Sequence, residues 1–190
     1  MQVDRILYPI QTLGPGERLV IWTIGCSKQC YNCANPELWN NQPEKNICVE
    51  ELANIIKQAV KNQVIDGITI TGGDPLEQSE ELNKLLPLLK ENTDDILVFT
   101  GYTTEEAQNI FSESEWNNFT LNTTAMIDGP YIDDLNDNKC VLRGSTNQNI
   151  VYFDDTKKGL YLQYLEKGRS VQNVYYKNNL ISVGIHNKDI

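Results

Sequence analysis

Histidine is almost absent from this sequence, since His186 is the only one among 190 residues. A site that needs two histidines, such as the helical HExxH zinc motif, is therefore excluded. Long apolar runs are missing too, and none approaches the roughly 20 residues that span a membrane. The N-terminus, MQVDRILYPI, lacks a basic segment followed by a long apolar one, so no signal peptide is expected. These absences predict a cytoplasmic protein.

Basic residues are too few to balance the acidic ones. The chain has 16 Lys and Arg against 26 Asp and Glu, which gives a formal net charge of −10. Such a surface repels phosphate backbones and argues against nonspecific binding of nucleic acid. Hydrophobic residues make up 40% and charged residues 22%, as is usual for a soluble globular domain. No internal repeat or low-complexity linker interrupts the chain.

Strand and helix patterns alternate along most of the sequence. Strands are predicted over 18–24, 65–71, 95–100, 123–128 and 149–153, and helices over 48–62 and 78–91. Thr103 and Glu106 have the spacing of a capping box and open another helix. Pro87 is expected to kink or shorten the helix over 78–91. The alternation predicts an α/β fold with a mainly parallel sheet and helical crossovers.

The last part of the chain departs from this alternation. Residues 158–167 favour a short helix, and residues 171–176 and 180–185 favour a hairpin. The sequence therefore predicts a core over 1–153 and a C-terminal helix–hairpin extension over 154–190, packed on the same domain.

Three of the five cysteines fall within GCSKQCYNC at residues 25–33. In a cytoplasmic chain such a group points to metal rather than to disulfides. Cys26, Cys30 and Cys33 offer three of the four thiolates that a four-iron cluster takes, which leaves one iron open to a small molecule. The alternative is a structural zinc ion with Cys48 or Cys140 as fourth ligand, although the usual second C-x2-C pair is missing.

A second motif, ITITGGDPLEQ at residues 68–78, leads from an apolar strand into a glycine turn. Loops at the carboxyl ends of parallel strands bind the ligands of α/β proteins. Gly72 and Gly73 allow the backbone to approach a ligand closely, and Asp74 adds charge that suits an ammonium group. Taken alone, Gly-Gly-Asp-Pro is also typical of an ordinary turn between strand and helix.

The cysteine motif followed by GGDP resembles the radical S-adenosylmethionine (SAM) superfamily. Further segments resemble the activating enzymes of anaerobic ribonucleotide reductase, in consecutive order between residues 8 and 153. They are GPGERLVIW (14–22), ANPELW (34–39), VFTGYTTEE (98–106), IDGPYIDDL (127–135) and LRGSTNQNI (142–150). The RGSTNQ segment is not a general radical SAM feature. Asn32 and Ala34 depart from the aromatic residue and the histidine that often occupy these places in relatives.

The resemblance implies an incomplete (β/α) barrel in which Cys26, Cys30 and Cys33 bind a [4Fe-4S] cluster. It implies reductive cleavage of SAM to a 5′-deoxyadenosyl radical, with flavodoxin or ferredoxin as electron donor. That radical would remove a hydrogen from a glycine of a partner enzyme. The resemblance assigns SAM or substrate contacts to Gly72, Gly73, Asp74, Pro75, Thr100, Gly101, Tyr102, Asp128, Arg143, Ser145, Asn147 and Gln148.

The extension leaves the substrate open. The leading hypothesis is a glycyl radical enzyme such as anaerobic ribonucleotide reductase. The second is a ribosomal peptide or another protein, and the third is a zinc-binding module without catalysis. The extension could cover the cluster, bind another partner or extend the fold. His186 is expected to be solvated, and Cys48 and Cys140 to have no role in the site.

Overall fold

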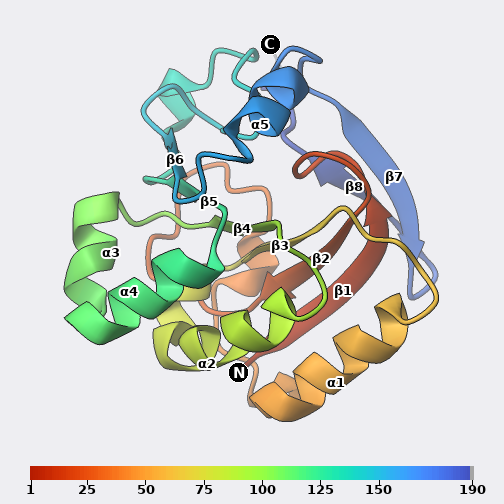
Figure 1. Cartoon of the computed structure of the whole chain (residues 1–190). Helices are drawn as coiled ribbons and strands as arrows, with labels where there is room; N and C mark the ends of the chain where they lie inside the picture. The colour runs from red at the N-terminus through yellow and green to blue at the C-terminus, as the bar shows by residue number, and fades with distance from the viewer. Residues whose placement is uncertain (189–190) are drawn as a thin grey trace.

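A six-stranded mixed sheet forms the centre of the protein, whose computed structural model describes residues 1–188 (Figure 1). The strands are β1 (Val3–Ile10), β2 (Arg18–Thr23), β3 (Gly67–Gly72), β4 (Ile96–Phe99), β5 (Ala125–Asp128) and β6 (Asn149–Tyr152), and they lie in that order. Strands β2 to β5 pair in parallel, whereas β1 and β6 pair antiparallel at the two edges. The predicted α/β class and mainly parallel sheet are confirmed.

Helices cross over between the parallel strands and cover one face of the sheet (Figure 1). They are α1 (Val49–Val60), α2 (Ser79–Lys90), α3 (Thr104–Ile110) and α4 (Glu113–Asn122), with short 3₁₀ turns η1 (Pro36–Leu38), η2 (Pro43–Lys45), η3 (Pro75–Gln78) and η4 (Asp133–Leu135). Leu19 and Ile21 of β2 belong to the core on this face. Successive strand residues point to opposite faces, so Val20 and Trp22 lie on the other side. Among residues 1–188, no helix combines the length and apolarity needed to cross a membrane.

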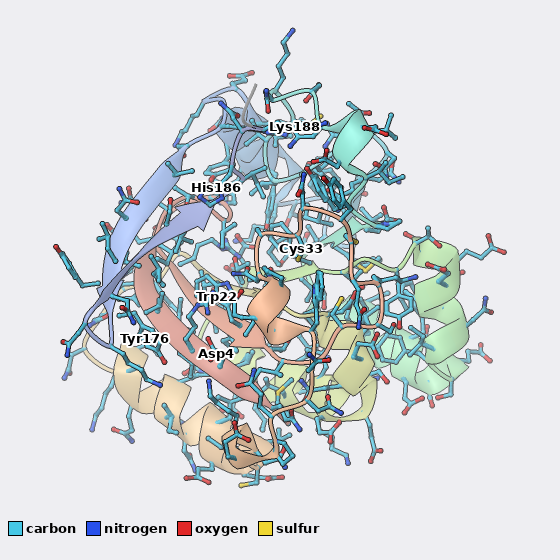
Figure 2. All side chains as sticks on the ribbon, turned by 180° about the vertical axis from the view of Figure 1, so that it is seen from behind. Asp4, Trp22, Cys33, Tyr176, His186 and Lys188 are labelled. Carbon is cyan, nitrogen blue, oxygen red and sulfur yellow. The ribbon has the colours of Figure 1, made fainter. Side chains whose placement is uncertain are left out.

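The C-terminal extension covers that other face of the sheet. Helix α5 (Lys158–Leu165) brings Tyr161 and Tyr164 into a core with residues of β4 and β5. The hairpin of β7 (Val171–Tyr176) and β8 (Asn179–Gly184) brings Val183 against Val20 and Trp22. Figure 2 shows the hairpin lying across β1 and β2, where the Tyr176 hydroxyl donates to the Asp4 carbonyl at 3.2 Å. The predicted helix and hairpin are confirmed.

Strand β1 is missing from the sequence-based prediction. In the structure, Ile10 is the one buried residue of this strand and most of the others are half-buried. The sequence therefore shows no clear alternation of apolar and polar residues over this stretch. Asp4, Arg5 and Pro9 also interrupt the apolar pattern that marks a strand. The strand owes its place to pairing with β2, which is a long-range contact.

Of the two effects expected of Pro87, a kink or a shorter helix, shortening does not occur, because α2 continues to Lys90. A proline inside a helix leaves the carbonyl of the residue four places earlier without its usual N–H partner. Here that carbonyl belongs to Asn83, and it accepts a hydrogen bond from the Asn118 amide at 2.9 Å. Asn83 in turn donates to the Glu115 carbonyl at 2.9 Å. Helix α4 therefore supplies the bond that the proline removes.

A buried ion pair ties the sheet to the C-terminal extension. Arg18 of β2 is fully buried; its Nη1 donates to Asp95 Oδ2 at 2.7 Å, and its Nε donates to Thr69 Oγ1 at 2.7 Å. The Tyr161 hydroxyl of α5 donates to the second carboxylate oxygen of Asp95, also at 2.7 Å. Gly67 leaves room for the guanidinium, since a Cβ atom there would overlap it. Satisfied in this way, the pair avoids the cost of an isolated buried charge.

We expect Tyr161→Phe to lower the free energy of unfolding by about 1–3 kcal/mol, because one oxygen of buried Asp95 loses its donor. The matched control is Tyr175→Phe on the hairpin, where Tyr175 is 82% exposed, and it should change stability by less than about 0.5 kcal/mol. Urea unfolding at an unchanged m-value measures both. Equal midpoints for the two variants would contradict the role given to Tyr161.

Candidate functional site

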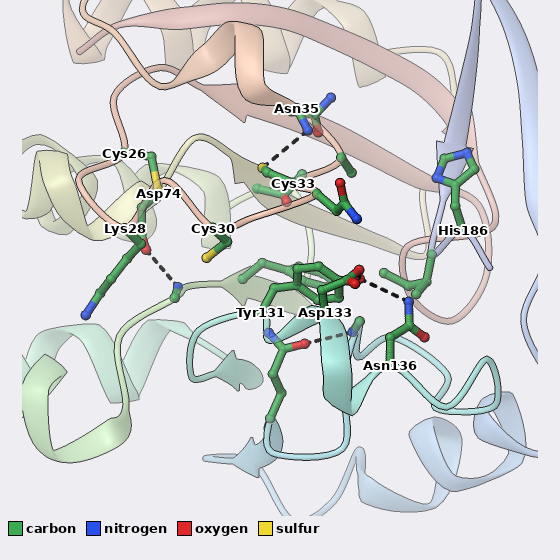
Figure 3. A pocket seen from close by; sticks show the side chains of 18 of the residues that line it. Cys26, Lys28, Cys30, Cys33, Asn35, Asp74, Tyr131, Asp133, Asn136 and His186 are labelled. Atoms are coloured by element: carbon green, nitrogen blue, oxygen red, sulfur yellow. Dashed lines mark hydrogen bonds between the residues drawn. The ribbon is translucent and has the colours of Figure 1, made fainter. Parts of the chain in front are cut away.

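A cavity of about 520 Å³ opens where the parallel strands end at their carboxyl termini (Figure 3). The loop after β2, the turns after β3 and β4, the segment after β5 and the last described residues all contribute to its wall. Nine of the predicted site residues line it: Cys26, Cys30, Cys33, Gly72, Gly73, Asp74, Thr100, Gly101 and Gln148. Their place matches the rule that α/β proteins bind ligands at this edge of the sheet.

The three cysteines lie on one loop that closes back on itself beside the cavity. The Gly25 N–H donates to the Leu38 carbonyl at 2.8 Å, and the Cys26 N–H donates to the Trp39 carbonyl at 2.9 Å. Within the loop, the Cys33 N–H donates to the Cys30 carbonyl at 3.1 Å. These bonds hold three half-buried thiols around a common space.

The donor set of this loop suits an iron–sulfur cluster held at three corners. Thiolates are the usual ligands of such clusters, and each binds a different iron, so the sulfurs surround a volume rather than one ion. Among residues 1–188, no three Cys, His, Asp or Glu side chains are grouped around a single-ion site. Burial raises the pKa of the Cys26 and Cys30 thiols, so metal binding here must displace protons.

The other two cysteines lie away from the cavity. Cys48 is exposed at the start of α1. The Cys140 thiol donates to a carboxylate oxygen of Asp137 at 3.5 Å. Neither residue is part of the cavity wall, so neither is placed to serve as the fourth ligand of a zinc ion bound by the cysteine loop.

The glycine turn packs directly against the start of the cysteine loop. The Gly73 N–H donates to the Thr23 carbonyl at 2.8 Å, and the Asp74 N–H donates to the Gly25 carbonyl at 2.7 Å. A Cβ atom on Gly73 would collide with that Gly25 carbonyl. Gly72 has φ of +115°, a conformation that side chains rarely allow. The two glycines are therefore needed for a close contact between main chains.

Asp74 is buried and links this turn to the turn after β4. Its Oδ1 accepts from the Leu76 N–H at 3.0 Å and from the Thr100 hydroxyl at 2.8 Å, and its Oδ2 accepts from the Gly101 N–H at 2.7 Å. Burial raises the pKa of Asp74 to about 6, although these hydrogen bonds favour the charged form. Pro75 follows as the first residue of η3.

This raised pKa predicts a pH-dependent contribution to stability. Between the ordinary value of 3.8 and about 6, the folded protein holds a proton that the unfolded chain has lost. The contribution of Asp74 to stability therefore falls as the pH rises through this window, by on the order of 3 kcal/mol.

Asp74→Asn lacks this titration, so the stability advantage of the wild type over the variant should shrink between pH 4 and pH 7. Urea unfolding of the metal-free proteins across this range measures the difference. A gap that stays constant or widens would contradict a raised pKa of Asp74.

A set of side chains that the sequence does not reveal holds the cysteine loop from outside. The Glu77 carboxylate accepts from the Ser27 N–H at 2.9 Å, from the Ser27 hydroxyl, and from the Tyr102 hydroxyl at 2.8 Å. Burial opposes the ionisation of Glu77, but the bonds from Ser27 and Tyr102 and the charge of Lys28 together outweigh it and lower the pKa of the carboxyl. Lys28 lies 4.0 Å from the centre of the Tyr102 ring and pairs with Glu106 at 3.2 Å.

We expect Glu77→Ala to loosen the loop next to Cys26 and to raise the alkylation rate of Cys26 about three- to tenfold in the metal-free protein. Glu77→Gln, which keeps one acceptor oxygen, should show a smaller increase. Glu80→Ala is the control, since Glu80 is exposed and pairs with Lys84 on α2. Iodoacetamide labelling read by peptide mass spectrometry gives the rates, and equal rates for all variants would refute the role of Glu77 in holding the cysteine loop.

The remaining predicted contacts lie outside the cavity wall. They are Pro75, Tyr102, Asp128, Arg143, Ser145 and Asn147. Asp128 accepts from the N–H and hydroxyl of Thr104, at 2.9 and 2.6 Å, at the start of α3. Arg143 donates to the Gln148 carbonyl at 3.1 Å. Their roles toward SAM or substrate stay predictions.

The RGSTNQ segment folds around one glutamine. The Gln148 side-chain oxygen accepts from the Gly144 N–H at 2.7 Å and the Ser145 N–H at 3.2 Å, and its amide donates to the Gly129 carbonyl at 2.8 Å. The Ser145 hydroxyl accepts from the Ile132 N–H at 3.1 Å. These bonds fix the loop after β5, which forms the side of the cavity opposite the cysteines (Figure 3).

The extension also reaches the cavity, which no sequence motif indicates. Residues Gly184, Ile185, His186, Asn187 and Lys188 are part of its wall. His186 is exposed, as expected, and its Nε2 lies 2.9 Å from the Ser182 hydroxyl.

Comparison with known proteins places this site in a family. The family profile described as the 4Fe-4S single cluster domain matches residues 12–151. This range holds the cysteine loop, the glycine turn and the RGSTNQ segment, and it leaves the whole C-terminal extension over 154–190 outside. An α/β protein with a three-cysteine cavity at its strand ends is thus an iron–sulfur protein by class. The chain belongs to the 4Fe-4S single cluster domain family.

Similar proteins carry the names of activating enzymes. The anaerobic ribonucleoside-triphosphate reductase-activating protein of Enterobacteria phage T4 is 32% identical over 155 residues, covering 79% of this chain and 93% of the relative. Its counterpart in Escherichia coli K12 is 29% identical over 150 residues, covering 74% and 92%. The pyruvate formate-lyase-activating enzyme of Staphylococcus aureus USA300 is 29% identical over 174 residues, covering 84% and 67%. The predicted resemblance to the radical SAM activating enzymes is confirmed.

Proposed function

We propose that this protein is a radical SAM enzyme that generates a glycyl radical on a partner protein, most simply an anaerobic ribonucleotide reductase. The observation that carries the proposal is the cavity in which three half-buried thiols meet the glycine turn at the carboxyl ends of the strands. The names of the relatives, which are activators of two different enzymes, support the same conclusion.

In this proposal Cys26, Cys30 and Cys33 would bind a [4Fe-4S] cluster in the cavity that the glycine turn also lines. When bound, the cluster supplies the electron that cleaves SAM into methionine and a 5′-deoxyadenosyl radical. Gly72, Gly73, Thr100 and Gly101 line the same cavity and would border SAM there. Asp74 holds these two turns together through its three hydrogen bonds.

The wall of the cavity also protects a reactive species. Phe99, Leu142 and Ile185 give it apolar sides, which exclude water and restrict side reactions. The protein thus contributes binding, orientation and shielding, while the cofactors carry the bond cleavage.

We further propose that the sheet is an incomplete (β/α) barrel with a core over 1–153 and the extension over 154–190. Four parallel strands with helices on one face support this reading.

A cytoplasmic location is proposed because reduced thiols persist in that compartment. A flavodoxin or ferredoxin is the proposed electron donor. The net charge of −10 disfavours nucleic acid as a partner.

The anaerobically reconstituted protein should be brown and contain about four irons per chain. With reductant and SAM it should release 5′-deoxyadenosine, and with a cognate reductase it should produce a glycyl radical by electron paramagnetic resonance. Cys30→Ala should abolish both products, because it removes one corner of the cluster. Cys48→Ala is the matched control, since Cys48 lies outside the cavity, and it should retain both.

Two other results would change the assignment. SAM cleavage without a glycyl radical on a cognate reductase would favour a ribosomal peptide or another protein as substrate. Colourless protein with one zinc and no iron after anaerobic preparation would reject the radical mechanism in favour of a zinc-binding module.

A further inference from the structure

The last described residues form a side of the cavity that the family match does not contain. We call Gly184–Lys188 the wall segment; all five of its residues line the cavity, whereas the family profile ends at residue 151. Figure 3 shows His186, which follows the end of β8 by two residues, beside the space that lies between Cys33 and Asn136. The segment therefore borders the predicted cluster site without belonging to the matched domain.

One buried arginine holds the wall segment against the rest of the cavity. The Arg169 side chain is only 5% exposed. Its Nη1 donates to the His186 carbonyl at 3.1 Å and to Asn136 Oδ1 at 2.9 Å, and its Nε donates to the Cys140 carbonyl at 2.8 Å. Its Nη2 donates to the Gly144 carbonyl at 3.2 Å. The guanidinium has donors in a fixed planar fork, so it joins several chain segments at once.

Two further anchors fix the ends of the wall segment. At its end, Lys188 Nζ pairs with Asp133 Oδ2 at 2.9 Å and donates to the Asp133 carbonyl at 2.8 Å. Before its start, the Thr12 hydroxyl donates to the Val183 carbonyl at 2.9 Å. Gly184 has φ of +140°, and a Cβ atom there would collide with the Ser170 carbonyl. The segment is thus held at both ends and in its middle.

We propose that the wall segment determines which part of a partner protein reaches the cavity, and that Arg169 is the positioning residue that fixes it. The cavity then admits a narrow, glycine-bearing chain segment and shields the thiols from bulkier groups. The identity of this substrate rests on the proposed function, whereas the shielding does not.

The shielding is tested on the metal-free, full-length chain. Cys48→Ser and Cys140→Ser leave the cavity thiols as the only reactive cysteines, and their labelling is followed with N-ethylmaleimide and with a bulky polyethylene-glycol maleimide. Arg169→Ala and Lys188→Ala should each raise the rate with the bulky reagent about tenfold, and the rate with the small reagent much less. Lys167→Ala is the control, because Lys167 is exposed, its ammonium lies 5.7 Å from the centre of the Tyr164 ring, and it is not part of the cavity wall.

If the labelling rates with the bulky reagent stay at the control value in both variants, the wall segment does not shield the cavity thiols. Circular dichroism checks the fold of each variant, and Lys188→Ala keeps the test valid if Arg169→Ala does not fold. Arg169→Lys keeps the charge but loses the fork, so its rate should lie between those of the wild type and Arg169→Ala.

The selection of one partner segment by the wall segment is tested on the reconstituted enzyme with a cognate partner protein. In Arg169→Ala, the 5′-deoxyadenosine released per glycyl radical formed should rise at least about fivefold with the whole partner, because the radical is no longer confined to one chain segment. An unchanged ratio alongside faster labelling would refute selection. Loss of SAM cleavage in the wild type would refute the proposed function and leave the labelling result standing.

Discussion

The close contact between the end of β3 and the start of the cysteine loop sets the geometry of the whole site. Gly73 lies against Gly25, and the Gly25 carbonyl accepts a hydrogen bond from the next residue of the turn, Asp74. Main-chain atoms can approach so closely only where side chains are absent. This contact brings two motifs about fifty residues apart in the chain to one cavity, and Asp74 then adds the turn after β4. The cysteine loop, the glycine turn and the turn after β4 are thus held together by direct hydrogen bonds.

The sequence predicts the parts of the site that depend on local chemistry. Cysteine is rarely placed three times in eight residues without metal, and a strand that runs into two glycines marks a turn that needs unusual backbone freedom. The alternation of periods 2 and 3.6 likewise predicts β2 to β5 and the helices α1 and α2, and the capping box predicts the start of α3. Helix α4, a separate helix over Glu113–Asn122, is missing from the prediction. Each of these signals is contained in a window shorter than about twenty residues, so it needs no knowledge of the folded chain.

What the sequence misses depends on partners far along the chain. Glu77 holds Ser27 across 50 residues, and nothing near either residue marks the pair. Arg169 binds mostly carbonyl oxygens, which every residue possesses, so its partners leave no trace in the side-chain pattern. Pro87 is tolerated because Asn118 on another helix replaces the lost bond. Local rules predict the elements, whereas these contacts require the assembled fold.

The extension has a second consequence, which concerns how such a chain can diverge. One face of the sheet carries Val20, Trp22 and Leu97, and the extension covers it with tyrosines of α5 and valines of the hairpin. A related chain without this segment would expose that apolar surface to solvent unless residues of β2 and β4 were replaced by polar ones. Gain or loss of the C-terminal elements and the polarity of β2 and β4 are therefore expected to change together, although these strands lie far from the extension in the sequence.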